Sequence, residues 1–203
     1  MKERGMIFNG EMTRAILNGR KTMTRRPIKW RQTRFTEMGE REDGSKWPWS
    51  EDCENCSDYW HPCPYGKPGD RIWVRETWAR YNIDQESHDM AYRATPPADW
   101  PEEGKWRPSI HMPRWASRIL LEITDVRVQR LNDISEADAR REGITDGGCL
   151  NCGNPEPCCC DEPRPDATDA FAGLWQSIYG EESWKANPWV WVIEFRRVEV
   201  DPA

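Results

Sequence analysis

Apolar residues near the start of the chain predict a strand followed by a helix. Residues 6–8, Met-Ile-Phe, form a short apolar run that suits a strand. Asn9 then stands where its side chain can cap a helix, because apolar positions recur at helical spacing from there to Ile16. Residues 18 and 19, Asn-Gly, supply the signal that ends this helix.

Later stretches carry the patterns of five strands and two helices. The strands are predicted at residues 71–78, with Ile72, Val74 and Glu76 on one face, and at 90–93, 119–123, 126–128 and 189–195, with a break at 124–125. The helices are predicted at 135–143, with Ser135 as its cap, and from about residues 166–168 to Ile178. This mainly β pattern with peripheral helices is an α+β class and fits a small β-barrel.

Two segments interrupt the regular pattern. Residues 31–63 are polar, contain Gly39, Gly44 and Pro48, and predict an extended insertion that tryptophans anchor to the barrel. Those tryptophans are Trp47, Trp49 and Trp60. A second, cysteine-rich insertion is predicted at 145–165. A chain of 203 residues is long enough for one domain with such additions, so we predict a single domain over residues 1–203.

Composition narrows the class of protein. The 13 tryptophans are far above ordinary usage, and each needs burial or stacking, which argues against a disordered chain. The net charge of −6 excludes a protein that coats nucleic acid indiscriminately, but it leaves room for a basic cleft on an acidic body. No apolar run approaches the length of a bilayer span, and the N-terminus lacks the apolar stretch of a signal peptide. We therefore expect a cytoplasmic protein with no membrane contact.

Basic residues gather in the segment that follows the first predicted helix. Residues 19–26, Gly-Arg-Lys-Thr-Met-Thr-Arg-Arg, bring together one lysine, two threonines and three arginines. No acidic residue occurs from Met12 to Thr36. Such a run is often only a solvated surface, but here it predicts a local positive field on an acidic protein.

The spacing within this segment has a counterpart in a known superfamily. The pattern Gly-x-Lys-x-x-Thr-x-Arg, formed by Gly19, Lys21, Thr24 and Arg26, resembles the signature of the ASCH superfamily. Its members are PUA-like small β-barrels associated with RNA and modified nucleosides. Residues 63–66, 69–78 and 187–191 look like segments of ASCH proteins carried by bacteriophages and prophages. The resemblance covers about residues 5–26, 69–78, 119–144 and 189–198, and implies a PUA-like barrel.

The resemblance also implies an activity. Some small bacterial ASCH members are amidohydrolases that remove the acetyl group from N(4)-acetylcytidine with a lysine, a threonine and a glutamate. The matching positions are Lys21, Thr24 and Glu142, with Glu136 as the alternative glutamate. A threonine hydroxyl attacks only if a neighbour takes its proton, and a lysine can do so only if its pKa is lowered. In a regular strand Lys21 and Thr24 would point to opposite faces, so a shared site requires a bend.

Substrate binding and two further functions stay open. The expected substrate-binding side chains are Arg20, Arg26, Arg75, Glu76, His111 and Arg114. Between Gly104 and Leu121 basic residues alternate with tryptophans and no acid intervenes, which suits the stacking of unpaired bases in a non-catalytic RNA- or nucleotide-binding module. In a ribonuclease, His111 would act as general acid or base. The expected ligand is a modified nucleoside or single-stranded RNA.

Two loops repeat nearly the same spacing of soft metal ligands. They consist of Cys53, Cys56, His61 and Cys63, and of Cys149, Cys152, Cys158 and Cys160. Four such ligands suit a tetrahedral structural zinc ion and leave no position open for catalysis. One site shared by the first two cysteines of each loop is an alternative. Disulfides are another, which reduced cytosolic thiols disfavour. We predict no organic cofactor.

Overall fold

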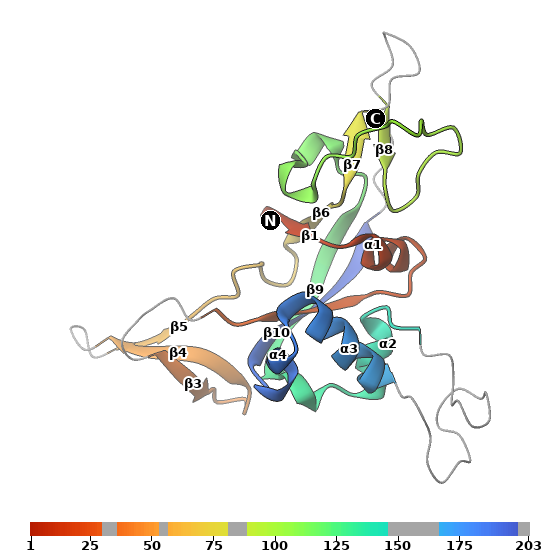
Figure 1. The fold of residues 1–203 in the computed structure, drawn as a ribbon. Helices are drawn as coiled ribbons and strands as arrows, with labels where there is room; N and C mark the ends of the chain where they lie inside the picture. Colours follow the sequence, from red (N-terminus) through yellow and green to blue (C-terminus); the bar gives the residue numbers. More distant parts are fainter. Residues whose placement is uncertain (30–35, 53–56, 81–88, 146–166, 199–203) are drawn as a thin grey trace. The chain divides into compact units, whose positions relative to one another are not determined.

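The computed structural model of the protein is mainly β with a few helices, an α+β arrangement (Figure 1). It describes residues 1–29, 36–52, 57–80, 89–145 and 167–198. The chain divides into two compact units, each built from separate stretches. Unit 1 consists of Met1–Arg20, Tyr65–Thr124 and Phe195–Ala203, and unit 2 consists of Lys21–Pro64 and Asp125–Glu194.

The largest sheet has five strands in the order β1-β6-β9-β10-β2. These strands are β1 (Glu3–Ile7), β6 (Arg71–Arg75), β9 (Leu120–Arg130), β10 (Trp189–Val198) and β2 (Met23–Pro27). β1 is parallel to β6, whereas the β6–β9 and β10–β2 pairs are antiparallel. The strands predicted at 71–78 and 189–195 are confirmed, although β6 ends earlier, at Arg75.

The break predicted at residues 124–125 is wrong, because β9 is one continuous strand. Thr124 and Asp125 are both exposed, so their polarity marks solvent-facing strand positions rather than a turn. The division between the two units also falls between these two residues.

The sheets among the described residues are open. The five-stranded sheet is accompanied by one sheet of three strands and one of two strands, and no closed barrel is found in this part of the chain. The small barrel that we expected is thus not seen there. None of the described helices is long and apolar enough to cross a membrane.

Unit 1 contains the first helix and a small hairpin. Its further elements are α1 (Gly10–Leu17), β7 (Trp78–Arg80), β8 (Met90–Tyr92) and the short 3-10 helices η1 (Ser109–His111) and η2 (Arg114–Ala116). Asn9 caps α1 as predicted, because its side-chain oxygen accepts the backbone N–H of Met12 at 2.8 Å. Met112 and Ala116 pack with Trp78 in a buried cluster. This cluster holds the segment that carries two of the predicted substrate-binding residues.

Unit 2 contains a second sheet and the remaining helices. They are β3 (Thr36–Glu40), β4 (Lys46–Asp52), β5 (Ser57–Trp60), η3 (Leu131–Asp133), α2 (Glu136–Arg141), α3 (Ala167–Tyr179) and α4 (Glu182–Lys185). The three strands pair antiparallel, so the described part of the segment expected to be an extended insertion is regular sheet. Trp47 meets Trp191 of β10 edge to face, with ring centroids 4.9 Å apart, and this contact connects the sheet to β10.

The core of unit 2 joins β2 and β10 to the helices. It is formed by Met23, Leu131, Ile134, Ala139, Ala167, Phe171, Trp175, Val190 and Val192. Ser135 caps α2 as predicted, because its hydroxyl accepts the backbone N–H of Asp138 at 3.1 Å. The backbone N–H of Thr22 donates to the carbonyl of Arg141 at 2.9 Å. This bond ties the segment before β2 to the end of α2.

Candidate functional site

Lys21 is a buried lysine in the short segment between α1 and β2. Gly19 takes a φ of 73°, in the left-handed region that glycine favours, and turns the chain after the helix. Lys21 follows two residues later and is only 2 % exposed. Its Nζ donates to the Glu142 carboxylate oxygen Oε2 at 2.6 Å and to the Glu142 backbone carbonyl at 2.8 Å.

Glu142 reaches Lys21 because it ends helix α2. Its backbone N–H donates to the carbonyls of Asp138 and Ala139, and Gly143 follows with a φ of 92°. The helix end therefore directs both a free carbonyl and a carboxylate toward the lysine. The Glu142 side chain is 3 % exposed. The lysine and the glutamate selected from the sequence are thus hydrogen-bonded partners, and we refer to them as the Lys21–Glu142 pair.

The surroundings shift the pKa of this lysine downward. Burial lowers the pKa of Lys21 below its ordinary 10.5, and this effect outweighs the opposing attraction of the Glu142 carboxylate. The charges of Arg26 and Arg25 lower the pKa further. A lysine in such a position can accept a proton closer to neutral pH than an exposed lysine can.

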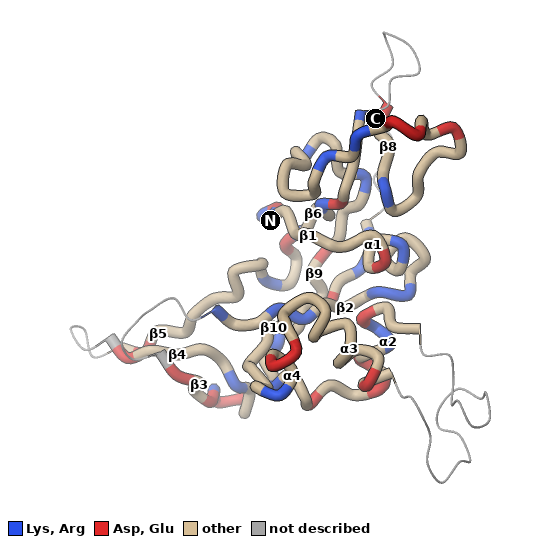
Figure 2. The backbone as a smooth tube through the Cα atoms, in the orientation of Figure 1, with Lys and Arg blue, Asp and Glu red and all other residues tan. Residues whose placement is uncertain are grey.

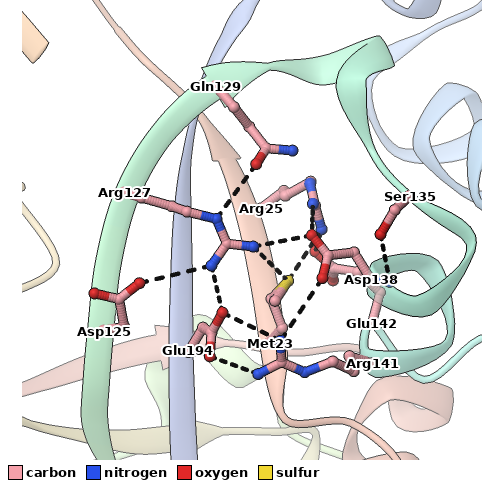
Figure 3. Close-up of polar contacts among 10 residues, drawn as sticks. All are labelled: Met23, Arg25, Asp125, Arg127, Gln129, Ser135, Asp138, Arg141, Glu142 and Glu194. Carbon is pink, nitrogen blue, oxygen red and sulfur yellow. Dashed lines mark hydrogen bonds and ion pairs between the residues drawn. The ribbon is translucent and has the colours of Figure 1, made fainter. Parts of the chain in front are cut away.

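Arg25 is a second cation on the same carboxylate, and the sequence did not mark it as a catalytic or substrate-binding residue. Its side chain is completely buried and donates to Glu142 Oε1 at 3.2 Å and to Asp138 Oδ2 at 2.9 Å (Figure 3). Met23 accepts from the same guanidinium at 3.2 Å. The sequence did contain a sign that Arg25 faces the same side as Lys21. Lys21, Met23 and Arg25 follow one another at intervals of two residues, and residues at this spacing share one face of a strand.

Thr24 occupies the other face of β2. Its neighbours Met23 and Arg25 both point toward the Glu142 side, and successive strand residues alternate. Thr24 is 2 % exposed, and no hydrogen bond to its hydroxyl is found within the described ranges. The structure thus brings Lys21 and Glu142 together, but shows no contact between Thr24 and either of them in that part of the chain.

Further charges of unit 2 extend the site. Asp138 also accepts from Arg127 at 2.9 Å, and Glu194 accepts from Arg127 and Arg141 (Figure 3). Burial raises the pKa of Glu194, but the hydrogen bonds from Arg141 and Arg127 outweigh it and hold the pKa below its ordinary value. We call these residues and the pair the charge cluster: Lys21, Arg25, Arg127, Asp138, Arg141, Glu142 and Glu194. Figure 2 marks where basic and acidic residues occur along the backbone.

Most of the expected substrate-binding residues lie in unit 1, apart from half-buried Arg26 in unit 2. Arg20 and His111 are exposed there, and Arg75 donates to the carbonyl of Ile110. Glu76 is buried and is held by Arg118 through bonds of 2.9 and 3.1 Å. Arg114 pairs with Glu3 at 2.8 Å. Glu76 and Arg114 are therefore already neutralised by partners within the unit.

Six of the eight predicted zinc ligands lie outside the described residues; His61 and Cys63 are described. The His61 ring nitrogen Nε2 is 2.9 Å from the Ser50 hydroxyl, and Cys63 is buried. No group of three or more potential metal ligands occurs within the ranges that the structure covers. Two residues are too few to test a site of four ligands, so structural zinc stays a prediction.

Comparison of the chain with models of known families, with curated proteins and with solved structures finds no match. Among the described residues, Lys21 combines burial with a hydrogen bond to a carboxylate and further charges nearby, and this combination suits proton transfer.

Proposed function

We propose that the protein binds a modified nucleobase or nucleoside and hydrolyses its acyl amide, as in N(4)-acetylcytidine, and that its fold is PUA-like and of the ASCH superfamily. The observation that supports this most is the hydrogen bond of 2.6 Å between the buried Lys21 amine and the Glu142 carboxylate. These are two of the three residues that the resemblance implies. A buried lysine with a lowered pKa is the kind of group that acts as general base.

In this proposal the Lys21–Glu142 pair moves the proton. Neutral Lys21 takes a proton from the attacking hydroxyl, whose oxygen bonds to the amide carbon. The proton then passes to the exocyclic nitrogen of the base as the carbon–nitrogen bond breaks, which releases the amine and a carboxylic acid, and the acid loses its remaining proton to solvent. Because Thr24 faces the other side of β2, a water molecule suits the attack better than the threonine that the sequence suggested.

The test is turnover of N(4)-acetylcytidine and related acylated nucleosides, with products identified by mass spectrometry. Lys21→Met and Glu142→Gln are expected to lower kcat by roughly 10²-fold or more, the usual contribution of a general acid or base. Lys29→Met, at an exposed lysine just after β2, is the control and should keep the parent rate. Thr24→Ala separates the two nucleophiles, because it abolishes turnover only if the threonine attacks. Parental turnover by Lys21→Met would rule out the proposed chemistry.

A non-catalytic RNA- or nucleotide-binding module is the second candidate, and an exposed tryptophan of unit 1 favours it. Trp115 is 60 % exposed, and its ring meets buried Trp78 edge to face at 5.8 Å. The Arg80 guanidinium lies 5.6 Å from the centre of the Trp115 ring. An unpaired base can stack on such a ring while arginine contacts phosphate. His111, exposed on η1, would serve as general acid or base if the RNA were also cleaved.

Hydrolysis and RNA-binding measurements on one preparation of the purified protein distinguish the two candidate functions. Absence of hydrolysis, together with binding of a short single-stranded RNA that Trp115→Ala weakens, would replace the first candidate by the second. Base stacking contributes about 1–3 kcal/mol per base, so the loss should be at least severalfold in Kd.

A further inference from the structure

The Glu142 carboxylate lies between two cations, and each of its oxygens serves one of them. Oε2 accepts from Lys21 at 2.6 Å, and Oε1 accepts from Arg25 at 3.2 Å. The side chains of Lys21 and Arg25 are completely buried, and that of Glu142 is 3 % exposed. Because the Arg25 bond occupies Oε1, the carboxylate cannot rotate away from the lysine without losing a charge-assisted hydrogen bond.

Arg25 is itself held on several sides. Its second terminal nitrogen donates to Asp138 at 2.9 Å, and its guanidinium carbon lies 5.9 Å from the centre of the Phe171 ring. Asp138 is in turn shared with Arg127 of β9. The guanidinium therefore has a fixed plane, so the direction from which it bonds Glu142 is fixed as well.

We propose that Arg25 is the positioning residue of the Lys21–Glu142 pair: it holds the carboxylate by Oε1, which keeps Oε2 on the lysine, and its charge helps to keep the lysine able to accept a proton. Arg25 acts through Glu142 and through its charge, and is not proposed to touch the substrate. The inference rests on the function proposed above for the role of the pair, but the geometry of the pair can be tested without turnover.

The charged groups around Lys21 fix the sign of the expected change. The groups that act on Lys21 are Arg25 and Arg26 of β2 and Glu142, which follows α2. Ion pairs connect Arg25 to the rest of the charge cluster: Asp138 and Arg141 of α2, Arg127 of β9 and Glu194 of β10. Arg25 and Arg26 both lower the pKa of Lys21, whereas Glu142 raises it. Lys21 bonds both the backbone carbonyl and the carboxylate of Glu142, so the carboxylate should remain near the lysine when Arg25 is replaced, and it would no longer be shared with a second cation. Removal of the Arg25 charge should therefore raise the pKa of Lys21 and reduce the neutral fraction of the amine at neutral pH.

The experiment follows the titration of Lys21 by NMR on protein with isotope-labelled lysine, in the parent, in Arg25→Met and in Arg140→Met. Lys21→Met serves to assign the signal. In Arg25→Met the midpoint should move to higher pH. Arg140→Met is the matched control, because Arg140 lies on α2 but pairs with Glu136 at 3.2 Å, and it should leave the midpoint in place. If Arg25→Met does not fold, Arg25→Gln, which removes the charge but keeps an amide donor, gives the same readout.

Turnover supplies the second readout. In Arg25→Met, kcat at neutral pH should fall roughly tenfold, as expected for loss of one charge-assisted hydrogen bond, and should recover as pH rises, with KM unchanged. Arg25→Lys keeps the charge and should restore the parent's pH profile. A Lys21 titration that does not move in a folded, uncharged variant overturns the inference, whatever the activity. No turnover in the parent, with the predicted shift present, overturns only the proposed function.

Discussion

At the scale of single residues, Glu142 is the residue on which the stability of the charge cluster depends most. Two completely buried cations, Lys21 and Arg25, use its carboxylate. Glu142→Gln leaves both without that anion, and removing one partner of a buried ion pair typically destabilises by about 3–5 kcal/mol. Lys21→Met should destabilise the protein less, because Arg25 retains its ion pairs with both Glu142 and Asp138.

Urea unfolding at neutral pH measures this difference. Glu182→Gln is the control, because its carboxylate on α4 is 80 % exposed and pairs with exposed Lys185. It should change the free energy of unfolding by less than about 1 kcal/mol. Equal losses of unfolding free energy for Glu142→Gln and Lys21→Met would show that the Arg25–Glu142 ion pair adds nothing to stability. The same unfolding data define the conditions for the turnover assay, because Glu142→Gln has to be compared with the parent at a temperature where both are folded.

The sequence marked Lys21 and Glu142 as site residues, but it did not show that Arg25 bonds Glu142. Lys21 and Glu142 were chosen because the resemblance to the ASCH superfamily implies a role for the residues at those positions. Which arginine of a basic run turns inward depends on where the strand begins, and β2 begins at Met23. From that start, Arg25 shares a face with Met23 and is 3 % exposed, whereas Arg20 lies outside the strand and is exposed.

At the scale of elements, Glu136 of α2 holds the start of α3. Its carboxylate accepts the backbone N–H groups of Ala167 and Thr168 at 2.9 and 3.0 Å, which are donors that a helix cannot satisfy within its own first turn. Glu136→Ala should therefore lower the free energy of unfolding by roughly 1 kcal/mol, the usual value of a capping interaction. Glu181→Ala, at an exposed carboxylate just before α4, is the matched control.

The contribution of Glu136 should depend on pH. Burial raises the pKa of Glu136, but hydrogen bonds from Thr168 and Ala167 outweigh burial and hold it below its ordinary 4.5. A carboxyl group with a lowered pKa stabilises the fold fully above the unfolded value, and that stabilisation is lost as pH falls through the folded value. Urea unfolding should thus show the difference between parent and variant at neutral pH and a smaller one in acid. A difference independent of pH would mean that packing, not the carboxylate, is responsible.

The elements with clear local signals were predicted correctly, and those without them were not. Asn9 and Ser135 cap the helices α1 and α2 as their positions indicated, and the apolar run at 189–195 lies in β10. The sheet of β3, β4 and β5 was missed, because its strands contain Gly39 and Pro48 and many charges. Strands of this kind are stabilised by pairing with one another and by contacts such as Trp47 with Trp191, which no local pattern records.

At the scale of the whole molecule, charge limits the size of the ligand. The chain has a net charge of −6, and Arg114 and Arg118 of the second basic segment are paired with acids in unit 1. A polynucleotide held along a groove needs several arginines or lysines free to neutralise phosphates. These pairings favour a ligand of nucleoside size over a long strand, in agreement with the proposed substrate.

The zinc prediction also concerns the whole molecule, because its ligands come from two distant segments of the chain. Protein purified without added metal should contain about one zinc ion for each loop that forms a four-ligand site. If the loops form separate sites, Cys152→Ser should remove one ion, and Cys53→Ser another. If they share one site, either variant should remove the only ion. Cys159→Ser is the control within the second loop, because Cys159 is the cysteine that the repeated spacing leaves out. Elemental analysis that finds no zinc in any preparation would contradict the prediction.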